Sequence, residues 1–397
     1  MKYNVIDLFV GCGGLSDGFL QTGKFKTLAA ADWEYSALKT FKNRLSNKWK
    51  YKDLDHIIHF DLQRTEELIY GFDDEFYGKS KGLKKIIHKK NVDFIIGGPP
   101  CQAYSIAGRV RDKRGMQDDY RNFLFESYVR MVKEFQPKAF VFENVEGILS
   151  AKPGGVSIVK RVKDSFKEIG YDITDSLRKQ ALFDTSFYNV PQKRKRVIIF
   201  GVRTSNKSLN IIDSFYELMK SKASVKPLNS SEAFKCLPKL IPVEGLEGIS
   251  HKLIDDEAEQ IKNHTPRKHN QRDIEIFRLL TSDIKSGKEE YTSTKALIKL
   301  YKDKTGKDSK FHKYNVIRED KPSNTIPAHL YKDGLRHIHP DPLQARSITV
   351  REAARIQSFD DNFEFIGSKG DQYKMIGNAV PPVFSKHIAE TILILKI

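Results

Sequence analysis

The sequence contains few cysteines, and their spacing is not typical of a disulfide framework or a zinc site. The 397 residues include three of them, Cys12, Cys101 and Cys236, an odd number without a CxxC pair. His337 and His339 are separated by one residue, and we interpret them as polar loop histidines. We therefore expect no metal, and any role of cysteine must rest on individual side chains.

Long hydrophobic runs are also absent. The sequence has no stretch of about eighteen apolar residues that could cross a membrane. The first residues, "MKYNVIDLFVGCGG", enter an expected strand almost at once, without the apolar core and small-residue cleavage site of a signal peptide. These features predict a cytoplasmic protein.

Acidic residues are outnumbered by basic ones. The chain has 68 Lys and Arg against 51 Asp and Glu, which gives a formal net charge of +17. Such an excess favours a polyanionic partner, either nucleic acid or a membrane surface. No basic amphipathic helix with an aromatic face stands out, which favours nucleic acid. A lysine-rich proteome would produce the same charge without any such partner.

The first half of the chain alternates between expected strands and expected helices. Helical spacing of apolar residues predicts helices within 120–136 and 157–171. Short apolar runs of the buried-strand type lie at 3–10, 25–32, 92–96, 138–145 and 196–203. This alternation predicts an α/β fold with a parallel, doubly wound sheet.

The regular pattern fades after about residue 205. The segment 205–345 is polar, lysine-rich and irregular, whereas order returns from 346 and ends in an expected helix at 383–397. We therefore expect a discontinuous first domain, 1–204 plus 346–397, and a second, smaller domain at 205–345.

A glycine-rich turn follows the first expected strand, in "DLFVGCGGLSDGF" (7–19). Gly11, Gly13 and Gly14 would let backbone N–H groups approach a ligand at a helix N-terminus. Asp32 closes the next strand about twenty residues on, where its carboxylate can accept from ribose hydroxyls. Ser16 replaces the third glycine of the dinucleotide fingerprint. The motif favours a nucleoside-containing cofactor, and the alternative is a tight turn with Cys12 as a small buried hydrophobe.

The stretch "GGPPCQAYS" (97–105) places a cysteine behind two glycines and two prolines at the end of an expected strand. Ligands bind at this carboxyl edge in open α/β sheets. A thiolate there would be a nucleophile, whereas the commoner fate of a cysteine is to be buried and inert. The rigid turn favours the first interpretation for Cys101.

Two further motifs carry ionisable groups to strand ends. Glu143 in "FENV" follows a strand, where a partly desolvated carboxyl has a raised pKa and can hold a proton; the alternative is a helix cap or an ion pair. Arg194 and Arg196 alternate in "QKRKR" before the next strand. Alternation would place both arginines on one face, where they could form bidentate hydrogen bonds to a carbonyl or phosphate. The alternative interpretation is a solvated basic edge.

Together these segments resemble the cytosine-C5 DNA methyltransferases of bacterial restriction–modification systems. The resemblance covers all of the chain except 205–345, with the motifs in the family's usual order. Its six motifs are "DLFVGCGG", "GGPPCQAYS", "ENV", "QKRKR", "TVREAARIQSF" (349–359) and "GNAVPP" (377–382).

The resemblance implies a Rossmann-like S-adenosylmethionine-dependent methyltransferase sheet and a role for each matching residue. Cys101 would attack C6 of cytosine, and Glu143 would protonate or hydrogen-bond N3. Arg196 would contact O2, with Arg194 nearby. C5 would then take the methyl group of S-adenosylmethionine. The target base must leave the DNA stack, because C6 cannot be attacked inside it.

The resemblance also implies a cofactor site in the first domain and DNA recognition by the second. Asp32 would contact the ribose, Trp33 the adenine ring and Asp61 its amino group. The implied cofactor residues are Phe9, Gly11, Gly13, Gly14, Asp32, Trp33, Asp61, Pro100, Leu124 and Asn378. The loop 103–120 would close over the flipped base, and 205–345 would be a target-recognition domain for double-stranded DNA. We expect a monomer, and a cognate restriction endonuclease would act separately.

Four other functions fit the sequence less well. A nicotinamide dehydrogenase would favour a third glycine near position 16 and gives no reason for "PPCQ" with "ENV". Amino-group methyltransferases need no thiol. Transfer-RNA cytosine methyltransferases share the motifs but have smaller recognition regions and a different catalytic motif. A non-catalytic DNA-binding regulator would not need the complete set of catalytic residue types.

Overall fold

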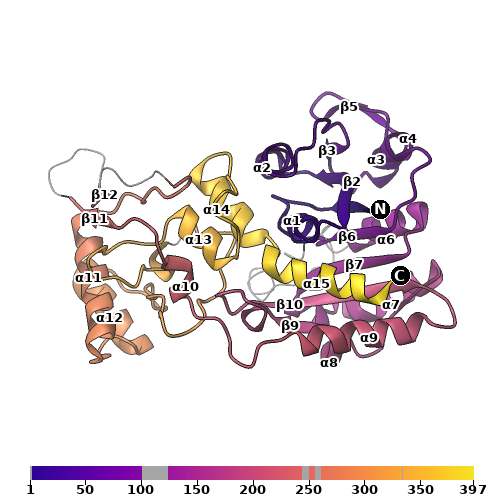
Figure 1. The fold of residues 1–397 in the computed structure, drawn as a ribbon. Helices are drawn as coiled ribbons and strands as arrows, with labels where there is room; N and C mark the ends of the chain where they lie inside the picture. Colours follow the sequence, from indigo (N-terminus) through magenta and orange to yellow (C-terminus); the bar gives the residue numbers. More distant parts are fainter. Residues whose placement is uncertain (1, 101–123, 244–249, 255–260, 333) are drawn as a thin grey trace. The chain divides into compact units, whose positions relative to one another are not determined.

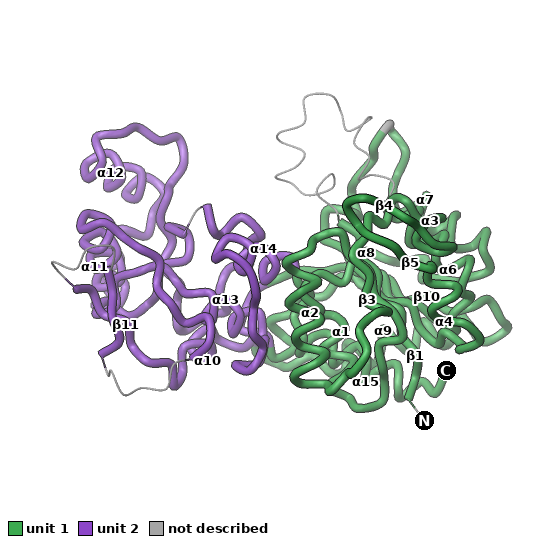
Figure 2. The backbone as a smooth tube through the Cα atoms, turned by 90° about the horizontal axis from the view of Figure 1, so that it is seen from above, with its two compact units in different colours: residues 1–189, 194–226, 379–397 green, residues 190–193, 227–378 purple. Residues whose placement is uncertain are grey.

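The computed structural model divides the chain into two compact units, each described here by itself (Figure 2). Unit 1 comprises 1–189, 194–226 and 379–397, and unit 2 comprises 190–193 and 227–378. The structure describes residues 2–100, 124–243, 250–254, 261–332 and 334–397.

Unit 1 is built on an eight-stranded mixed sheet (Figure 1). The order along the sheet is β3 (Ile57–His59), β2 (Phe25–Asp32), β1 (Tyr3–Leu8), β6 (Phe94–Gly97), β7 (Ala139–Val145), β10 (Lys195–Arg203) and β8 (Tyr171–Ile173). A further strand, β9 (Leu182–Asp184), also pairs with β10. The first five strands of this order are parallel, and β10 runs antiparallel to β7, β8 and β9.

The α/β class and five expected strands are confirmed, but the expectation of a wholly parallel sheet is wrong. The segment expected as a strand at 196–203 is β10, and it is antiparallel to its neighbours. A buried apolar run has the same composition in either direction, because both of its faces are covered. Strand direction depends on the connection through α7 (Ile158–Glu168), β8 and β9, which the apolar pattern alone does not reveal.

Helices cover both faces of the sheet, as the side-chain directions of β7 and β10 show. Phe140 stacks on Phe166 of α7 at a centroid distance of 4.1 Å. Gly201 lies opposite Phe140 in the register, and a Cβ there would be 2.2 Å from its ring. The residue before Gly201, Phe200, points to the other face and stacks on Phe215 of α9 (Ser208–Ser221) at 4.2 Å. Therefore α7 and α9 lie on opposite faces.

The remaining elements of unit 1 complete these layers. The final helix, α15, lies along the first, α1 (Figure 1). A Cβ at Gly18 of α1 would be 2.4 Å from the backbone oxygen of Pro382, and Ser385 Oγ donates to Leu15 O at 2.5 Å. The elements are α1 (Gly14–Gln21), α2 (Tyr35–Asn47), α3 (Thr65–Tyr70), β4 (Phe72–Asp74), β5 (Gly78–Ser80), α4 (Leu83–Ile87), α6 (Leu124–Phe135), α7 (Ile158–Glu168), α8 (Leu177–Gln180), α9 (Ser208–Ser221) and α15 (Pro382–Leu395).

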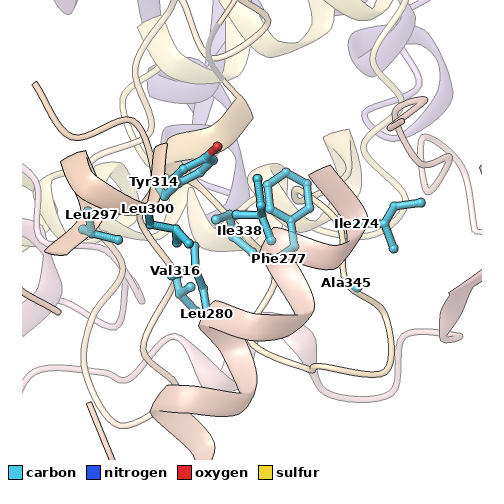
Figure 3. Packing of buried hydrophobic residues seen from close by; sticks show 10 residues of the cluster. Ile274, Phe277, Leu280, Leu297, Leu300, Tyr314, Val316, Ile338 and Ala345 are labelled. Carbon is cyan, nitrogen blue, oxygen red and sulfur yellow. The ribbon is translucent and has the colours of Figure 1, made fainter. Parts of the chain in front are cut away.

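Most described residues of unit 2 lie in irregular segments, and its regular elements are mainly helices. Its elements are α10 (Ser231–Phe234), β11 (Leu240–Pro242), β12 (His251–Leu253), α11 (Gln271–Ser286), α12 (Thr294–Thr305), α13 (Val350–Ile356) and α14 (Lys369–Asn378). Strands β11 and β12 form a separate antiparallel pair. One apolar cluster joins α11 and α12 to the extended segments around Tyr314 and Ile338 (Figure 3).

A buried ionic pair fixes the start of α13. The guanidinium of Arg346 contacts both carboxylate oxygens of Glu352 at 2.6 and 2.7 Å, and both side chains are buried. Thr349 caps the helix, and the Glu352 carboxylate accepts from the backbone N–H of Thr349 in a capping box.

Among the described helices, none is long and apolar enough to pass through a membrane.

The compact units do not follow the expected domain boundaries. Residues 205–226 belong to unit 1, because α9 covers β10 with Phe215 and Tyr216. Residues 346–378 belong to unit 2, where Arg346 and the two helices after it pack. The polar composition of 205–226 hides an amphipathic helix whose apolar face is buried.

Candidate active site

The glycine turn after β1 requires a left-handed backbone at several positions. Phe9, Gly11 and Gly13 have φ values of 59°, 55° and 90°. A Cβ at Gly13 would lie 2.1 Å from the ring of Phe41, so packing as well as φ requires glycine there. A Cβ at Gly11 would meet no atom of the described residues within 4 Å, so among these residues this part of the turn faces open space. A ligand can approach the backbone at Gly11.

Asp32 at the end of β2 holds this turn in place. Its Oδ2 accepts from Gly11 N and its Oδ1 accepts from Glu34 N, both at 2.7 Å. Burial raises the pKa of Asp32 to about 6, so the carboxyl is mostly ionised at neutral pH. Each oxygen keeps a second lone pair, and Asp32 can therefore also accept from a hydroxyl of a bound nucleoside.

Asp7 is a second buried carboxyl beside the turn, and the sequence interpretation gave it no role. Ser16 Oγ donates to its Oδ2 at 2.5 Å, and its Oδ1 has no hydrogen-bond partner among the described residues. Burial raises the pKa of Asp7 to about 8, so it is mostly protonated at neutral pH. Ser16, which replaces the third glycine of the fingerprint, therefore has a structural partner. In the sequence, the signal for this buried carboxyl is an acidic residue within the apolar strand "VIDLFV".

The residues expected to contact adenine follow two neighbouring strands. Trp33 comes directly after β2, and 54% of it is exposed. Its carbonyl lies 2.9 Å from Nε2 of His59, the last residue of β3. Asp61 follows soon after, and its Oδ1 accepts from Gln63 N at 3.0 Å. The exposed indole and this carboxylate thus come from the same edge of the sheet.

Three expected site residues lie at the limits of the described segments. Pro100 is half-buried and precedes 101–123, and Leu124 is buried at the start of α6. Cys101 and the expected loop 103–120 lie outside the described residues. Asn378, the last residue of α14, is exposed and belongs to unit 2, and its approach to a cofactor stays a prediction.

Glu143 and Arg196 form a close ion pair at the end of β7. Arg196 Nε lies 2.6 Å from Glu143 Oε1, and the two side chains are 12% and 11% exposed. A Cβ at Gly98 would lie 2.6 Å from Glu143 Oε2, so this carboxylate is also close to the backbone that leads into Pro99 and Pro100. An acid and a guanidinium are therefore paired, partly exposed, directly beside the turn that precedes Cys101.

Asn144 joins the end of β7 to the proline turn, and the sequence interpretation did not assign it. Its Nδ2 donates to Pro99 O at 3.3 Å, and its Oδ1 accepts from Val145 N at 2.9 Å. The side chain is buried. Asn144 stood inside the quoted motif "FENV", but only the fold shows that it fixes the proline turn.

The two alternating arginines have different surroundings. Arg194 is 1% exposed and its Nη2 donates to Ala379 O at 3.0 Å. Arg196 is partly exposed and pairs with Glu143. The bond to Ala379 ties the start of β10 to the segment before α15, which favours a structural contribution from Arg194.

The other cysteines and the paired histidines have no part in the candidate site. Cys12 is buried, and burial raises the pKa of its thiol to about 12, which confirms it as a small buried hydrophobe. Cys236 is exposed. His337 and His339 lie outside helices and strands, as expected of loop histidines, and both are buried in unit 2. Within the part of the chain that the structure describes, no group of His, Cys, Asp or Glu could hold a metal ion.

The sequence model of the C-5 cytosine-specific DNA methylase family matches residues 3–73 and 75–393. The chain belongs to this family. The methylase is 35% identical to Type II methyltransferase M.Bpa9945I of Bacillus paralicheniformis, over 98% of each chain. It is 32% identical to Type II methyltransferase M.DdeI of Desulfomicrobium norvegicum, over 98% of this chain and 88% of the relative.

The fold of the methylase is also found among solved structures. A protein described as a DNA modification methyltransferase encoded within a prophage (E. coli) aligns with a TM-score of 0.64 and 24% identity, over 100% of this chain and 99% of that one. This likeness concerns the fold alone. Family membership makes the chain a DNA (cytosine-5-)-methyltransferase, an enzyme class whose general methyl donor is S-adenosylmethionine.

Proposed function

We propose that this methylase flips a target cytosine out of duplex DNA, attacks C6 with Cys101 and transfers a methyl group from S-adenosylmethionine to C5. The observation that carries the proposal is the Glu143–Arg196 pair at the carboxyl edge of the sheet. Asn144 connects the same strand end to the proline turn directly before Cys101. An acid and a cation therefore lie beside the turn that leads, along the sequence, to Cys101.

The paired side chains suit the charge that develops on the base. The Cys101 thiolate adds to C6, and the electron pair of the C5–C6 double bond moves toward N3 and O2. Glu143 protonates or hydrogen-bonds N3 while Arg196 donates to O2, which stabilises this charge. C5 becomes enamine-like and takes the methyl group, and loss of the C5 proton then expels the thiolate. The covalent step is needed because C5 of unmodified cytosine is a poor nucleophile.

The glycine turn fits the methyl donor. The open space at Gly11 gives a nucleoside access to the backbone, and the Asp32 carboxylate can accept from its ribose hydroxyls. The exposed Trp33 ring offers a surface for its base. When bound, S-adenosylmethionine supplies an electrophilic methyl group. The other proposed contacts come from Phe9, Gly13, Gly14, Asp61, Pro100, Leu124 and Asn378.

DNA must be held while the base is out of the stack. Flipping costs a few kcal/mol, which contacts to the pocket and to the displaced strand must offset. We assign target recognition to 205–345, with basic residues on phosphates and other side chains on base edges. The loop 103–120 would close over the flipped base.

The named relatives support a place in bacterial restriction–modification. M.Bpa9945I and M.DdeI are Type II methyltransferases. By analogy, this enzyme would act as a cytoplasmic monomer that methylates DNA against a separate cognate endonuclease.

The test is methyl transfer from labelled S-adenosylmethionine to genomic duplex DNA, followed by nucleoside analysis. The expected product is 5-methylcytosine, and Cys101→Ser should abolish it. DNA that contains 5-fluorocytosine should become covalently trapped on the wild-type enzyme when the methyl donor is present, because fluorine at C5 blocks the release step. Labelled adenine, transfer to RNA but not DNA, or an active Cys101→Ser variant would contradict the proposal.

A further inference from the structure

Helix α12 (Thr294–Thr305) presents an apolar face to the rest of unit 2. Leu297 and Leu300 pack in the cluster that contains Leu280 of α11 and Tyr314 (Figure 3). Both ends of the helix are well defined. Ser293 Oγ accepts from Ala296 N at 3.1 Å at the start, and the chain turns at Gly306, with φ 68°, at the end. The orientation of the helix about its axis is therefore set by packing.

The opposite face of α12 carries a row of lysines. Lys295, Lys299 and Lys302 are exposed and follow the spacing i, i+4, i+7, which we call the lysine stripe. At 3.6 residues per turn these positions share one side, about 180° from the midpoint of Leu297 and Leu300. The stripe is about 10 Å long at a rise of 1.5 Å per residue.

The acidic residues around the stripe leave most of its charge uncompensated. Lys295 and Lys299 have no carboxylate within 4.0 Å among the described residues, whereas Lys302 Nζ lies 2.9 Å from Asp308 Oδ1. Glu289 in the preceding turn pairs with Arg318 instead, at 2.7 Å. Residues 285–313 as a whole contain nine lysines and four acidic residues.

We propose that the lysine stripe of α12 binds backbone phosphates of duplex DNA. The inference rests on the proposed function and adds a surface to it. A strand of duplex DNA presents a phosphate about every 3.4 Å of helix axis, so a stripe of about 10 Å faces roughly three of them. The lysines match the phosphates in charge and spacing, and these contacts do not depend on the base sequence of the DNA. The stripe would therefore add affinity and help to position the enzyme on the duplex.

The expected effect follows from counterion release. Each neutralised phosphate contributes about −0.9 to the slope of log affinity against log salt, so three contacts contribute about −2.7. Over a fourfold rise in salt, from about 50 to 200 mM, these contacts alone would weaken binding roughly 40-fold. Loss of the stripe should remove this part of the salt dependence and leave the rest.

The experiment measures binding of the full-length enzyme to a fluorescent duplex of about 30 base pairs across that salt range. The triple variant Lys295→Gln, Lys299→Gln, Lys302→Gln should bind more weakly at low salt, with a slope reduced by about 2 to 3. The matched control replaces Lys24, Lys26 and Lys90 by Gln. These exposed lysines lie at or before the starts of β2 and β6, on the edge of the sheet opposite the candidate site. The control should keep the wild-type slope within about half a unit.

A substitution with the opposite sign separates charge from structure. Asp308→Asn removes the carboxylate that competes with a phosphate for Lys302, so it should strengthen DNA binding while the slope stays within about half a unit of the wild-type value. A helix that was merely damaged would not bind DNA more tightly. Equal slopes for wild type and triple variant, or equal losses in triple variant and control, would overturn the proposal.

This failure can be distinguished from failure of the proposed function. If the wild-type enzyme produces 5-methylcytosine and the triple variant shows unchanged binding, the stripe is a solvated surface and the chemistry stands. If the wild type neither methylates nor binds DNA, the proposed function fails, and the stripe proposal fails with it.

Discussion

The neighbouring cations Lys195 and Arg196 differ in what they contact. Arg196 Nε is 2.6 Å from Glu143, whereas Lys195 is exposed and lies 3.4 Å from Glu146. Arg196→Ala should lower kcat roughly 10²- to 10³-fold, because it removes a donor aimed at developing charge. The measurement is single-turnover methyl transfer at saturating DNA and methyl donor.

Lys195→Ala is the matched control for this prediction. It removes an adjacent positive charge that faces solvent, and its rate should stay within about threefold of wild type. Similar losses in both variants would mean that general charge, and not the contact with Glu143, determines the rate.

Asp32 gives cofactor binding a defined pH dependence. The pKa of Asp32 is raised to about 6 by burial, so the carboxyl gains a proton as pH falls through 6. A protonated carboxyl is a weaker acceptor for ribose hydroxyls and for Gly11 N. The affinity for S-adenosylmethionine, measured by calorimetry without DNA, should therefore fall between pH 7 and pH 5.

Asp32→Asn should bind the methyl donor weakly and with little pH dependence over this range. Asp7 does not complicate the test, because its pKa of about 8 keeps it mostly protonated from pH 5 to pH 7. An Asn variant with the same pH profile as wild type would assign the titration to another group.

At the scale of the secondary-structure elements, two glycines of one turn serve different purposes. Gly13 has φ 90° and lies against the ring of Phe41 in α2, whereas Gly11 has φ 55° and open space beside it. Gly13→Ala should destabilise the fold by about 2–4 kcal/mol, from left-handed strain plus the clash with the ring. Urea unfolding followed by circular dichroism measures this loss.

Gly11→Ala should cost only about 1–2 kcal/mol, from backbone strain alone. Its main effect should be on the methyl donor, because the added methyl group enters the space that a nucleoside would occupy. A Gly11→Ala variant that binds S-adenosylmethionine normally would place the cofactor away from this turn.

The elements that could be predicted from sequence are those with strong local signals. The strand Phe25–Asp32 was predicted with its observed bounds, because its apolar run ends at an acidic residue. The antiparallel direction of β10 was not predicted, since its composition suits either direction. The link from Asn144 to Pro99 spans 45 residues of sequence and has no local signal. Site residues inside motifs could be named, but the contacts that position them depend on the tertiary fold.

At the scale of the whole molecule, the domain boundaries show the same limit. The segment 205–226 is polar overall, yet α9 buries Phe215 and Tyr216 against β10. Composition predicts how polar a segment is, whereas membership of a compact unit depends on which side chains face a distant strand. Helices α13 and α14 follow the return of order at 346 but pack in unit 2.

Unit 2 should lose more stability in acid than unit 1. In unit 2, burial lowers the pKa of His251 and His337 to about 4 and of His269 and His339 to about 3. The unfolded chain takes up these protons near pH 6.5 and the folded unit does not, so stability is lost as pH falls from 6.5 toward 4. Each histidine contributes about 2 kcal/mol of this loss by pH 5.

In unit 1 the sign is reversed, because the raised pKa values of Asp7 and Asp32 mean that the folded unit binds protons that the unfolded chain releases above about pH 4. These two groups therefore stabilise unit 1 as pH falls from 7 to 5. Burial lowers the pKa of His56 and His387, which opposes part of this gain.

Tryptophan fluorescence can separate the two responses, because both tryptophans of the chain, Trp33 and Trp49, belong to unit 1. Circular dichroism reports helices of both units. In urea at pH 7 the two signals should change over similar concentrations, and at pH 5 a dichroism change should precede the fluorescence change. His251→Gln should narrow that separation, whereas replacing the exposed His88 by Gln should not. Coincident transitions at pH 5 would mean that the buried histidines of unit 2 are not its acid-sensitive groups.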